Sequence, residues 1–171
     1  MILGMSVATF TFIHVVLSLI GIAAGIVVVI EMLGSKKSDA WATLFLVTTV
    51  LTSVTGFFFP RDQLLPSHIV GIISLVLLAV AIAALRAYRL AGRWRGIYVV
   101  TAIAALYLNV FVAVVQGFLK IPFLTALAPT QHEPPFAIVQ GLVLLLFIAA
   151  GVFAFRSFRP QAPTLAVSGS V

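Results

Sequence analysis

The stretch "GIYVVTAIAALYLNVFVAVVQGFL", residues 96–119, contains no Asp, Glu, Lys or Arg. A helix that crosses the hydrocarbon core of a bilayer needs about 20 predominantly apolar residues, so this stretch is long enough to span a membrane. Four further charge-free runs are also long enough, and they cover residues 1–30, 40–60, 63–85 and 134–155. The sequence therefore predicts five transmembrane helices, over residues 9–31, 41–59, 66–88, 97–119 and 136–156.

The overall composition leads to the same class of protein. Hydrophobic residues make up 63% of the 171-residue chain and charged residues 8%, whereas a soluble domain is about 25% charged. We expect an all-α, polytopic membrane protein whose single helical bundle covers residues 1–158. Residues 159–171, rich in Pro, Ser and Gly, are expected to form a flexible tail. The chain has no cysteine, which excludes disulfides, thiolate metal sites and cysteine nucleophiles.

The distribution of basic residues predicts the orientation of this bundle. Eight of them fall on one side: Lys36, Lys37, Arg86, Arg89, Arg93, Arg95, Arg156 and Arg159. Only Arg61 and Lys120 fall on the other. Because short cytoplasmic loops carry an excess of Lys and Arg, we expect the N-terminus outside and the C-terminus in the cytoplasm. The same rule accounts for the net charge of +6 without a nucleic-acid partner.

Polar residues on the extracytoplasmic side predict a ligand-binding pocket that tapers toward the middle of the membrane. All three histidines lie there, and His132 adjoins Glu133 in the loop "APTQHEPPF", residues 128–136. Asn109, Gln116 and Lys120 are spaced by seven and then four residues, which places them on one helix face. The candidate binding residues are His14, His68, Asn109, Gln116, Lys120, His132, Glu133 and Gln140.

Each of these residues also has a structural interpretation. The amides can join helices through hydrogen bonds, which is a common use of such side chains in membranes. The loop residues His132 and Glu133 can simply be solvated. Gly21 and Gly25 form a G-x-x-x-G pair, and the threonines at 48, 52 and 55 share one helix face, a pattern that favours close helix packing.

Two functions remain open at this stage. In the first, the protein is a non-enzymatic binding protein for a small ligand, lipid or quinone, or an accessory subunit of a membrane complex, with the proline-rich loop as a lid. In the second, His14 and His68 ligate a b-type haem, or His14, His68 and His132 hold a divalent metal. No catalytic residue is identified. The expected partners are the bilayer and either a membrane protein or a second copy of the chain.

The stretch "IAALYLNVFVAVVQGFLKIP", residues 103–122, continues into "ALAPTQHEPPF", residues 126–136. Together with "PSHIVGIISLVLLAVAIAALRAYRLAGRW", residues 66–94, it resembles a group of small, uncharacterised proteobacterial inner-membrane proteins. The resemblance covers roughly residues 55 to 150 and implies a bacterial inner-membrane location. A looser likeness to small haem-binding four-helix membrane proteins rests on the histidines near helix starts.

Overall fold

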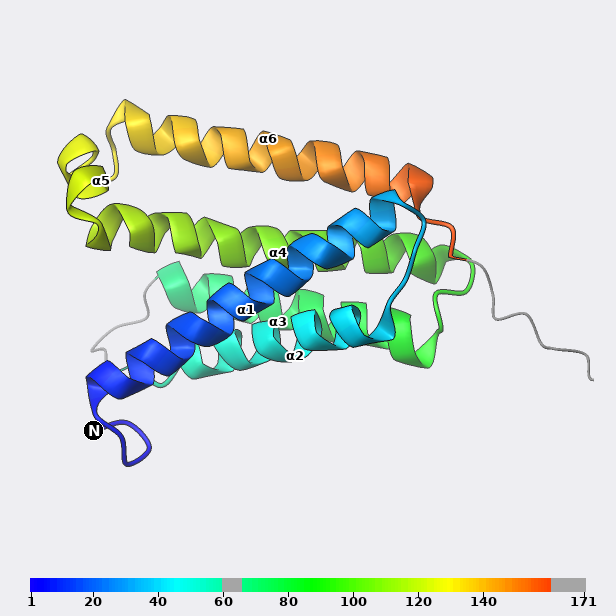
Figure 1. Ribbon diagram of the computed structural model, residues 1–171, viewed down its shortest axis with the longest axis horizontal. Coiled ribbons are helices and arrows are strands. Elements are labelled where there is room, and N and C mark those ends of the chain that lie inside the picture. The colour runs from blue at the N-terminus through cyan, green and yellow to red at the C-terminus, as the bar shows by residue number, and fades with distance from the viewer. Residues whose placement is uncertain (60–65, 161–171) are drawn as a thin grey trace, which may run out of the picture.

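The computed structural model describes residues 1–59 and 66–160. Within these residues, all the elements of regular secondary structure are helices. The expected tail lies almost entirely outside the described residues, as does Arg61. In chain order the elements are α1 (Val7–Leu33), α2 (Asp39–Gly56), α3 (Pro66–Ile82), the π-helix η1 (Ala83–Ala87), α4 (Arg93–Lys120), α5 (Pro122–Leu127) and α6 (Pro134–Ser157). The long helices run side by side along one axis, as Figure 1 shows.

Within residues 1–59 and 66–160, four helical segments are long and apolar enough to cross a membrane. They are Val7–Leu33, His68–Ala87, Arg93–Lys120 and Pro134–Ser157. Their outer surfaces are strongly apolar: on α6, for example, Leu142, Leu145 and Leu146 are each more than 60% exposed. An apolar surface of this extent is typical of a protein surrounded by lipid. The remaining long helix, α2, has 18 residues and carries several threonines.

The helices begin where the sequence supplies capping groups. The hydroxyl of Ser6 accepts a hydrogen bond from the backbone N–H of Thr9 at the start of α1, and Ser38 does the same for Trp41 at the start of α2. Proline occupies the first turn of α5 and of α6, where its missing N–H costs nothing.

The core of the bundle is shifted toward one end. On α4, every buried residue except Phe118 lies between Gly96 and Asn109, because α1, α2 and α3 converge on that half. Figure 1 shows α1 crossing α4 obliquely, while α6 lies on the outer side of α4. Only Gln140 and Ala154 of α6 are buried. The side chains are therefore closely packed between α1, α2 and α4, whereas most of α6 is exposed.

The two ends of the bundle differ in charge. At one end of the bundle, the C-terminal ends of α1 and α6 meet the N-terminal ends of α2 and α4 (Figure 1). This end carries the eight basic residues that the sequence analysis places together on one side. We call it the basic end. The opposite end holds the start of α1, the end of α2 and the start of α3, with α5 beside α6, and we call it the histidine end.

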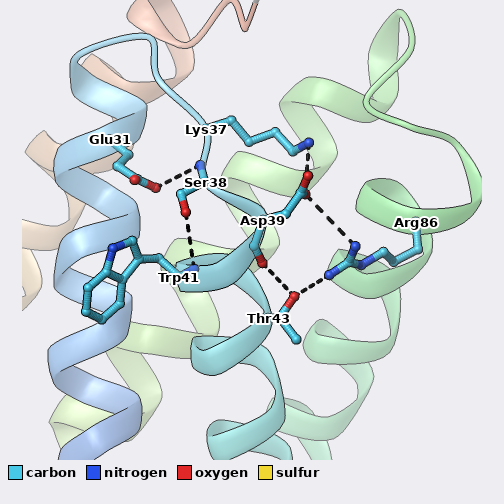
Figure 2. Close-up of polar contacts among 7 residues, drawn as sticks. All are labelled: Glu31, Lys37, Ser38, Asp39, Trp41, Thr43 and Arg86. Carbon is cyan, nitrogen blue, oxygen red and sulfur yellow. Dashed lines mark hydrogen bonds and ion pairs between the residues drawn. The ribbon is translucent and has the colours of Figure 1, made fainter. Parts of the chain in front are cut away.

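Polar contacts hold the basic end together around Asp39, as Figure 2 shows. The Nζ of Lys37 lies 3.0 Å from a carboxylate oxygen of Asp39, and a guanidinium nitrogen of Arg86 lies 4.0 Å from the same oxygen. Arg86 also donates to the hydroxyl of Thr43. The carboxylate of Glu31 accepts from the backbone N–H of Ser38 at 3.2 Å. These contacts join the α1–α2 connection to η1.

One sequence expectation needs correction. Residues 121–132 are too short to span a membrane and contain two prolines, which predicts a loop, but residues 122–127 form the helix α5. Pro122 is tolerated in its first turn. The hydroxyl of Thr125 donates to the carbonyls of Phe118 at 2.7 Å and of Ile121 at 3.1 Å. The short helix therefore folds back against the end of α4.

Candidate functional site: a buried polar cluster between three helices

Five polar side chains meet between α1, α2 and α4, and we call them the polar cluster: His14, Ser18, Thr49, Thr55 and Asn109. At the outer edge, Nδ1 of His14 lies 2.8 Å from Oγ1 of Thr55. One turn deeper on α1, the hydroxyl of Ser18 donates to the Oδ1 of Asn109 at 2.9 Å. The contacts join α1 to α2 at the first level and to α4 at the second.

The hydrogen bonds of Thr55 determine which nitrogen of His14 carries the proton. Its hydroxyl donates to the carbonyl of Leu51 at 2.7 Å, as threonines in helices commonly do. Oγ1 of Thr55 is then the acceptor for the Nδ1–H of His14. In the neutral ring, this leaves Nε2 without a proton and available as a hydrogen-bond acceptor.

Gly21 lets the three helices approach closely at the deepest level of the cluster. A Cβ atom on Gly21 would lie 3.0 Å from Oγ1 of Thr49, 3.1 Å from Oγ1 of Thr48 and 3.4 Å from Nδ2 of Asn109. The position of Gly21, seven residues after His14, places this level about 10 Å further along α1. The polar groups therefore extend from the histidine end into the interior of the bundle.

Two atoms of the polar cluster lack a hydrogen-bond partner among the described residues: Oγ1 of Thr49 and Nδ2 of Asn109. Thr49 is 1% exposed and Asn109 8% exposed, so neither side chain can be satisfied at the protein surface. Thr48 and Thr52, by contrast, each donate to the carbonyl four residues earlier. A buried polar group without a partner costs free energy, and both unpaired atoms carry a hydrogen that can be donated.

Apolar side chains enclose the cluster at both ends. At the outer end the ring of Phe59 stands edge-on to His14 with ring centres 5.2 Å apart, and Phe10 packs against Phe59 at 5.2 Å. At the inner end, a Cβ on Gly25 would lie 2.5 Å from Leu106 and 2.9 Å from Phe45. The surroundings therefore favour a ligand with an apolar body over a hydrated ion.

His14 and His68 contact different residues near the end of α2. The Cε1 of His14 lies 3.8 Å from the Cβ position of Gly56. His68 lies against Phe57, with ring centres 5.6 Å apart, and the ring of Phe57 in turn faces Gly71 on α3. Ligation of one haem by both imidazoles stays a prediction.

A three-histidine metal site receives no support from the geometry. Within residues 1–59 and 66–160, no three His, Asp or Glu side chains come close enough together to hold a metal ion. His132 is exposed in the α5–α6 connection. Gln116 and Lys120 are exposed on α4, although they share a helical spacing with the buried Asn109. The converging helices cover that face of α4 at the depth of Asn109 and leave it uncovered beyond.

The "APTQHEPPF" loop is structured by its own side chains. The carboxylate of Glu133 accepts from the hydroxyl of Thr130 at 2.8 Å and from its backbone N–H at 3.2 Å. Desolvation acts to raise the pKa of Glu133, but the hydrogen bonds from the Thr130 side chain and from the backbone of Glu133, Thr130 and His132 together outweigh it and hold the pKa below its ordinary value. Gln131 donates from Nε2 to the carbonyl of Val115 at 3.2 Å. Glu133 is thus used to shape the loop, and Gln131 anchors it to α4.

Gln140 joins α6 to α4 rather than to the polar cluster. Its Nε2 donates to the carbonyl of Phe111 at 3.2 Å, which is the interhelical use of an amide expected in a membrane. Its Oε1 is buried and has no hydrogen-bond partner among the described residues.

Of the eight candidate residues, the structure brings only His14 and Asn109 into the polar cluster. Ser18 and Thr49 belong to it but were not singled out in the sequence. The spacing of four residues between His14 and Ser18 was a usable signal, because it places both on one face of α1. Comparisons with protein-family models, with curated proteins and with solved structures found no match to this chain.

Proposed function

We propose that the chain crosses a bacterial inner membrane five times, with the basic end in the cytoplasm and the N-terminus outside. The fifth crossing would be α2, whose length of about 27 Å approaches the roughly 30 Å of the hydrocarbon core. Its exposed stripe is apolar and consists of Leu44, Val47, Leu51 and Val54. Most of its hydroxyls donate to carbonyls of the same helix, so they are tolerated in lipid.

The absence of cysteine from the chain makes this topology directly testable. Lys36→Cys introduces a thiol at the basic end, and His132→Cys introduces one at the histidine end. In intact cells, a membrane-impermeant maleimide is expected to label the His132→Cys variant and to leave Lys36→Cys unlabelled until the cells are opened. Labelling of Lys36→Cys alone in intact cells would show the opposite orientation.

We further propose that the protein is a non-enzymatic binding protein for a quinone, whose headgroup enters the polar cluster by separating the helices that pack closely at Gly21. This proposal rests on two buried donors, on Thr49 and Asn109, that have no hydrogen-bond partner among the described residues. A quinone offers carbonyl oxygens that accept such hydrogen bonds, on an apolar ring that suits the aromatic surroundings of Phe10 and Phe59. On reduction, its hydroxyl can donate to the free Nε2 of His14.

The test is a titration of the purified full-length protein, in mild detergent, with a short-chain quinone while its thermal stability is followed. A ligand that binds only the folded state raises stability in proportion to its affinity. Thr49→Val removes the unpaired hydroxyl with little change of shape, and we expect it to weaken quinone binding about two- to tenfold, the value of one hydrogen bond.

The matched control for this titration is Thr101→Val. The hydroxyl of Thr101 is also buried in the bundle, but it donates to the carbonyl of Ile97 at 2.7 Å and lies outside the polar cluster. This variant is expected to bind the quinone with unchanged affinity. Failure of the quinone to stabilise the wild-type protein, or equal binding by the wild type and Thr49→Val, would refute the proposed function.

A further inference from the structure

A second site, separate from the polar cluster, is indicated by a groove between α4 and α6. The groove has a volume of about 620 Å³, and its lining includes Ile103, Ala104, Tyr107, Phe147 and Gly151. It exists because small residues face each other there: a Cβ on Gly151 would still lie 3.8 Å from the nearest side-chain atom of Ile103. The apolar walls open to the side of the bundle that faces lipid.

The length of the groove matches one leaflet of a bilayer. Along α6 its lining extends from Leu144 to Arg156, and the twelve steps of rise between these residues correspond to about 18 Å of helix. One leaflet contributes half of the roughly 30 Å hydrocarbon core. An acyl chain that lies along this groove would therefore reach from the basic end to about the middle of the membrane.

Arginine side chains stand at the basic end of the groove. Arg156 forms part of its lining. An adjoining hollow of about 450 Å³ shares Val100 and Phe155 with the groove and is lined by Arg93 and Arg95. A positively charged hollow thus continues directly from the apolar groove.

No carboxylate in the described part of the chain forms an ion pair with these arginines. Within residues 1–59 and 66–160, the ion pairs at 4.0 Å or less both involve Asp39, with Lys37 and Arg86 as its partners. Arg95 donates to the carbonyls of Phe155 and Phe158, so its guanidinium is already positioned by α6. Arg93 and Arg156 are exposed and have no ion-pair partner in the described part of the chain.

We propose that this groove binds one anionic phospholipid, with the phosphate between Arg93 and Arg156 and an acyl chain along α4 and α6. A phosphate accepts hydrogen bonds from guanidinium groups in a geometry that arginine matches well. A net negative headgroup is required because the hollow carries uncompensated positive charge. The apolar groove beyond it selects a lipid over a free phosphate ion. The site does not depend on quinone binding at the polar cluster.

The experiment is native mass spectrometry of the full-length protein released from detergent, titrated with phosphatidylglycerol or with phosphatidylcholine of the same chain length. We expect tighter binding of phosphatidylglycerol. Each arginine near a membrane surface favours an anionic lipid by about fivefold, so Arg156→Gln should lower the preference about fivefold and Arg93→Gln/Arg156→Gln should largely abolish it.

Two further variants separate the headgroup from the chain. Gly151→Leu fills the groove and is expected to weaken binding of both lipids, without changing the preference between them as the arginine variants do. Lys36→Gln removes one exposed charge at the same end of the bundle, away from the groove, and should leave binding unchanged. Circular dichroism checks that each variant keeps its helices, and the single arginine variants serve if the double variant does not fold.

Three outcomes would overturn the proposal. Equal affinity of the wild-type protein for the two lipids would remove the role of charge. An equal loss of affinity in Lys36→Gln would mean that the basic end attracts anionic lipid only through its general charge. Competition by glycerol phosphate at the concentration of the lipid would show that the hollow binds a free phosphate and that the groove contributes nothing.

Discussion

Glycines beside α4 allow close contact at one place and leave a gap at another. On the side of α1 and α2, a Cβ on Gly25 would lie 2.5 Å from Leu106, so the helices touch. On the side of α6, a Cβ on Gly151 would lie 3.8 Å from Ile103, and a groove of about 620 Å³ remains. The helices α4 and α6 touch nearer the basic end, where a Cβ on Gly96 would lie 2.6 Å from Phe155. The closed interface with α1 and α2 holds polar groups, and the groove between α4 and α6 presents apolar walls.

The largest effect is expected from alanine at Gly25 and Gly151. Gly25→Ala forces Leu106 and Phe45, each 1% exposed, out of a packed position, and we expect it to lower the free energy of unfolding by about 1–3 kcal/mol. Gly151→Ala meets no close atom and should be neutral or stabilising by up to about 1 kcal/mol, because alanine favours helix. Reversible unfolding in mixed micelles measures both. Equal losses of unfolding free energy in Gly25→Ala and Gly151→Ala would show that the two sites are packed equally tightly.

A smaller effect on the free energy of unfolding is expected at the basic end, where Arg95 joins α4 to α6. Arg95 on α4 donates to the carbonyls of Phe155 and Phe158 at the end of α6, and its guanidinium lies 5.8 Å from the ring centre of Phe155. Arg95→Gln should cost about 1–2 kcal/mol of unfolding free energy, since charged hydrogen bonds to helix-end carbonyls are lost.

Arg156→Gln, which removes an exposed arginine nearby, is the control for this measurement and should change stability by less than about 0.5 kcal/mol. If Arg95→Gln and Arg156→Gln change the free energy of unfolding by the same amount, Arg95 does not hold α6 against α4 at that end of the groove.

The sequence predicts those parts of the fold that depend on one helix alone. It does not predict those that depend on how several helices pack together. The length of the charge-free runs depends on each helix alone. It correctly indicated that the described residues are helical and include segments long and apolar enough to cross a membrane. The spacing of Gly21 and Gly25 likewise indicated a close approach, and the structure places Thr49 and Leu106 against them.

The candidate site required knowledge of which helices cover which face. The spacing of Asn109 and Gln116 places both on one side of α4, yet Asn109 is buried and Gln116 exposed, because the oblique path of α1 covers only part of that side. Thr49 resembled its neighbours Thr48 and Thr52 in the sequence. Only the position of Gly21 opposite it distinguishes its hydroxyl from theirs.

The smallest effect is expected at the other end of the interface between α4 and α6, where the loop 128–136 leads into α6. Desolvation acts to raise the folded-state pKa of Glu133, but hydrogen bonds from the Thr130 side chain and from the backbone of residues 130, 132 and 133 together lower it from its ordinary value of 4.5. A lowered pKa means that the carboxylate stabilises the loop fully above pH 4.5, and that this stabilisation is lost as the pH falls through the lower, folded-state pKa.

Hydrogen exchange measures this effect. Relative to its intrinsic rate, the backbone amide of Thr130 should be protected at neutral pH and lose that protection under acidic conditions, whereas in Glu133→Gln the protection should be weaker at neutral pH and should not change as the pH falls. Protection that does not change with pH in the wild-type protein would show that Glu133 does not hold the loop.

The central claim is that the closed interface contains donors that the protein itself leaves unpaired. The most direct test compares the unfolding free energies of Thr49→Val and Thr101→Val with no quinone added. We predict that Thr49→Val is neutral or stabilising, since its hydroxyl has no partner to lose. Thr101→Val should cost about 1 kcal/mol, because its hydroxyl is paired. An equal loss in both variants would mean that Thr49 is already satisfied within the protein, which contradicts the account.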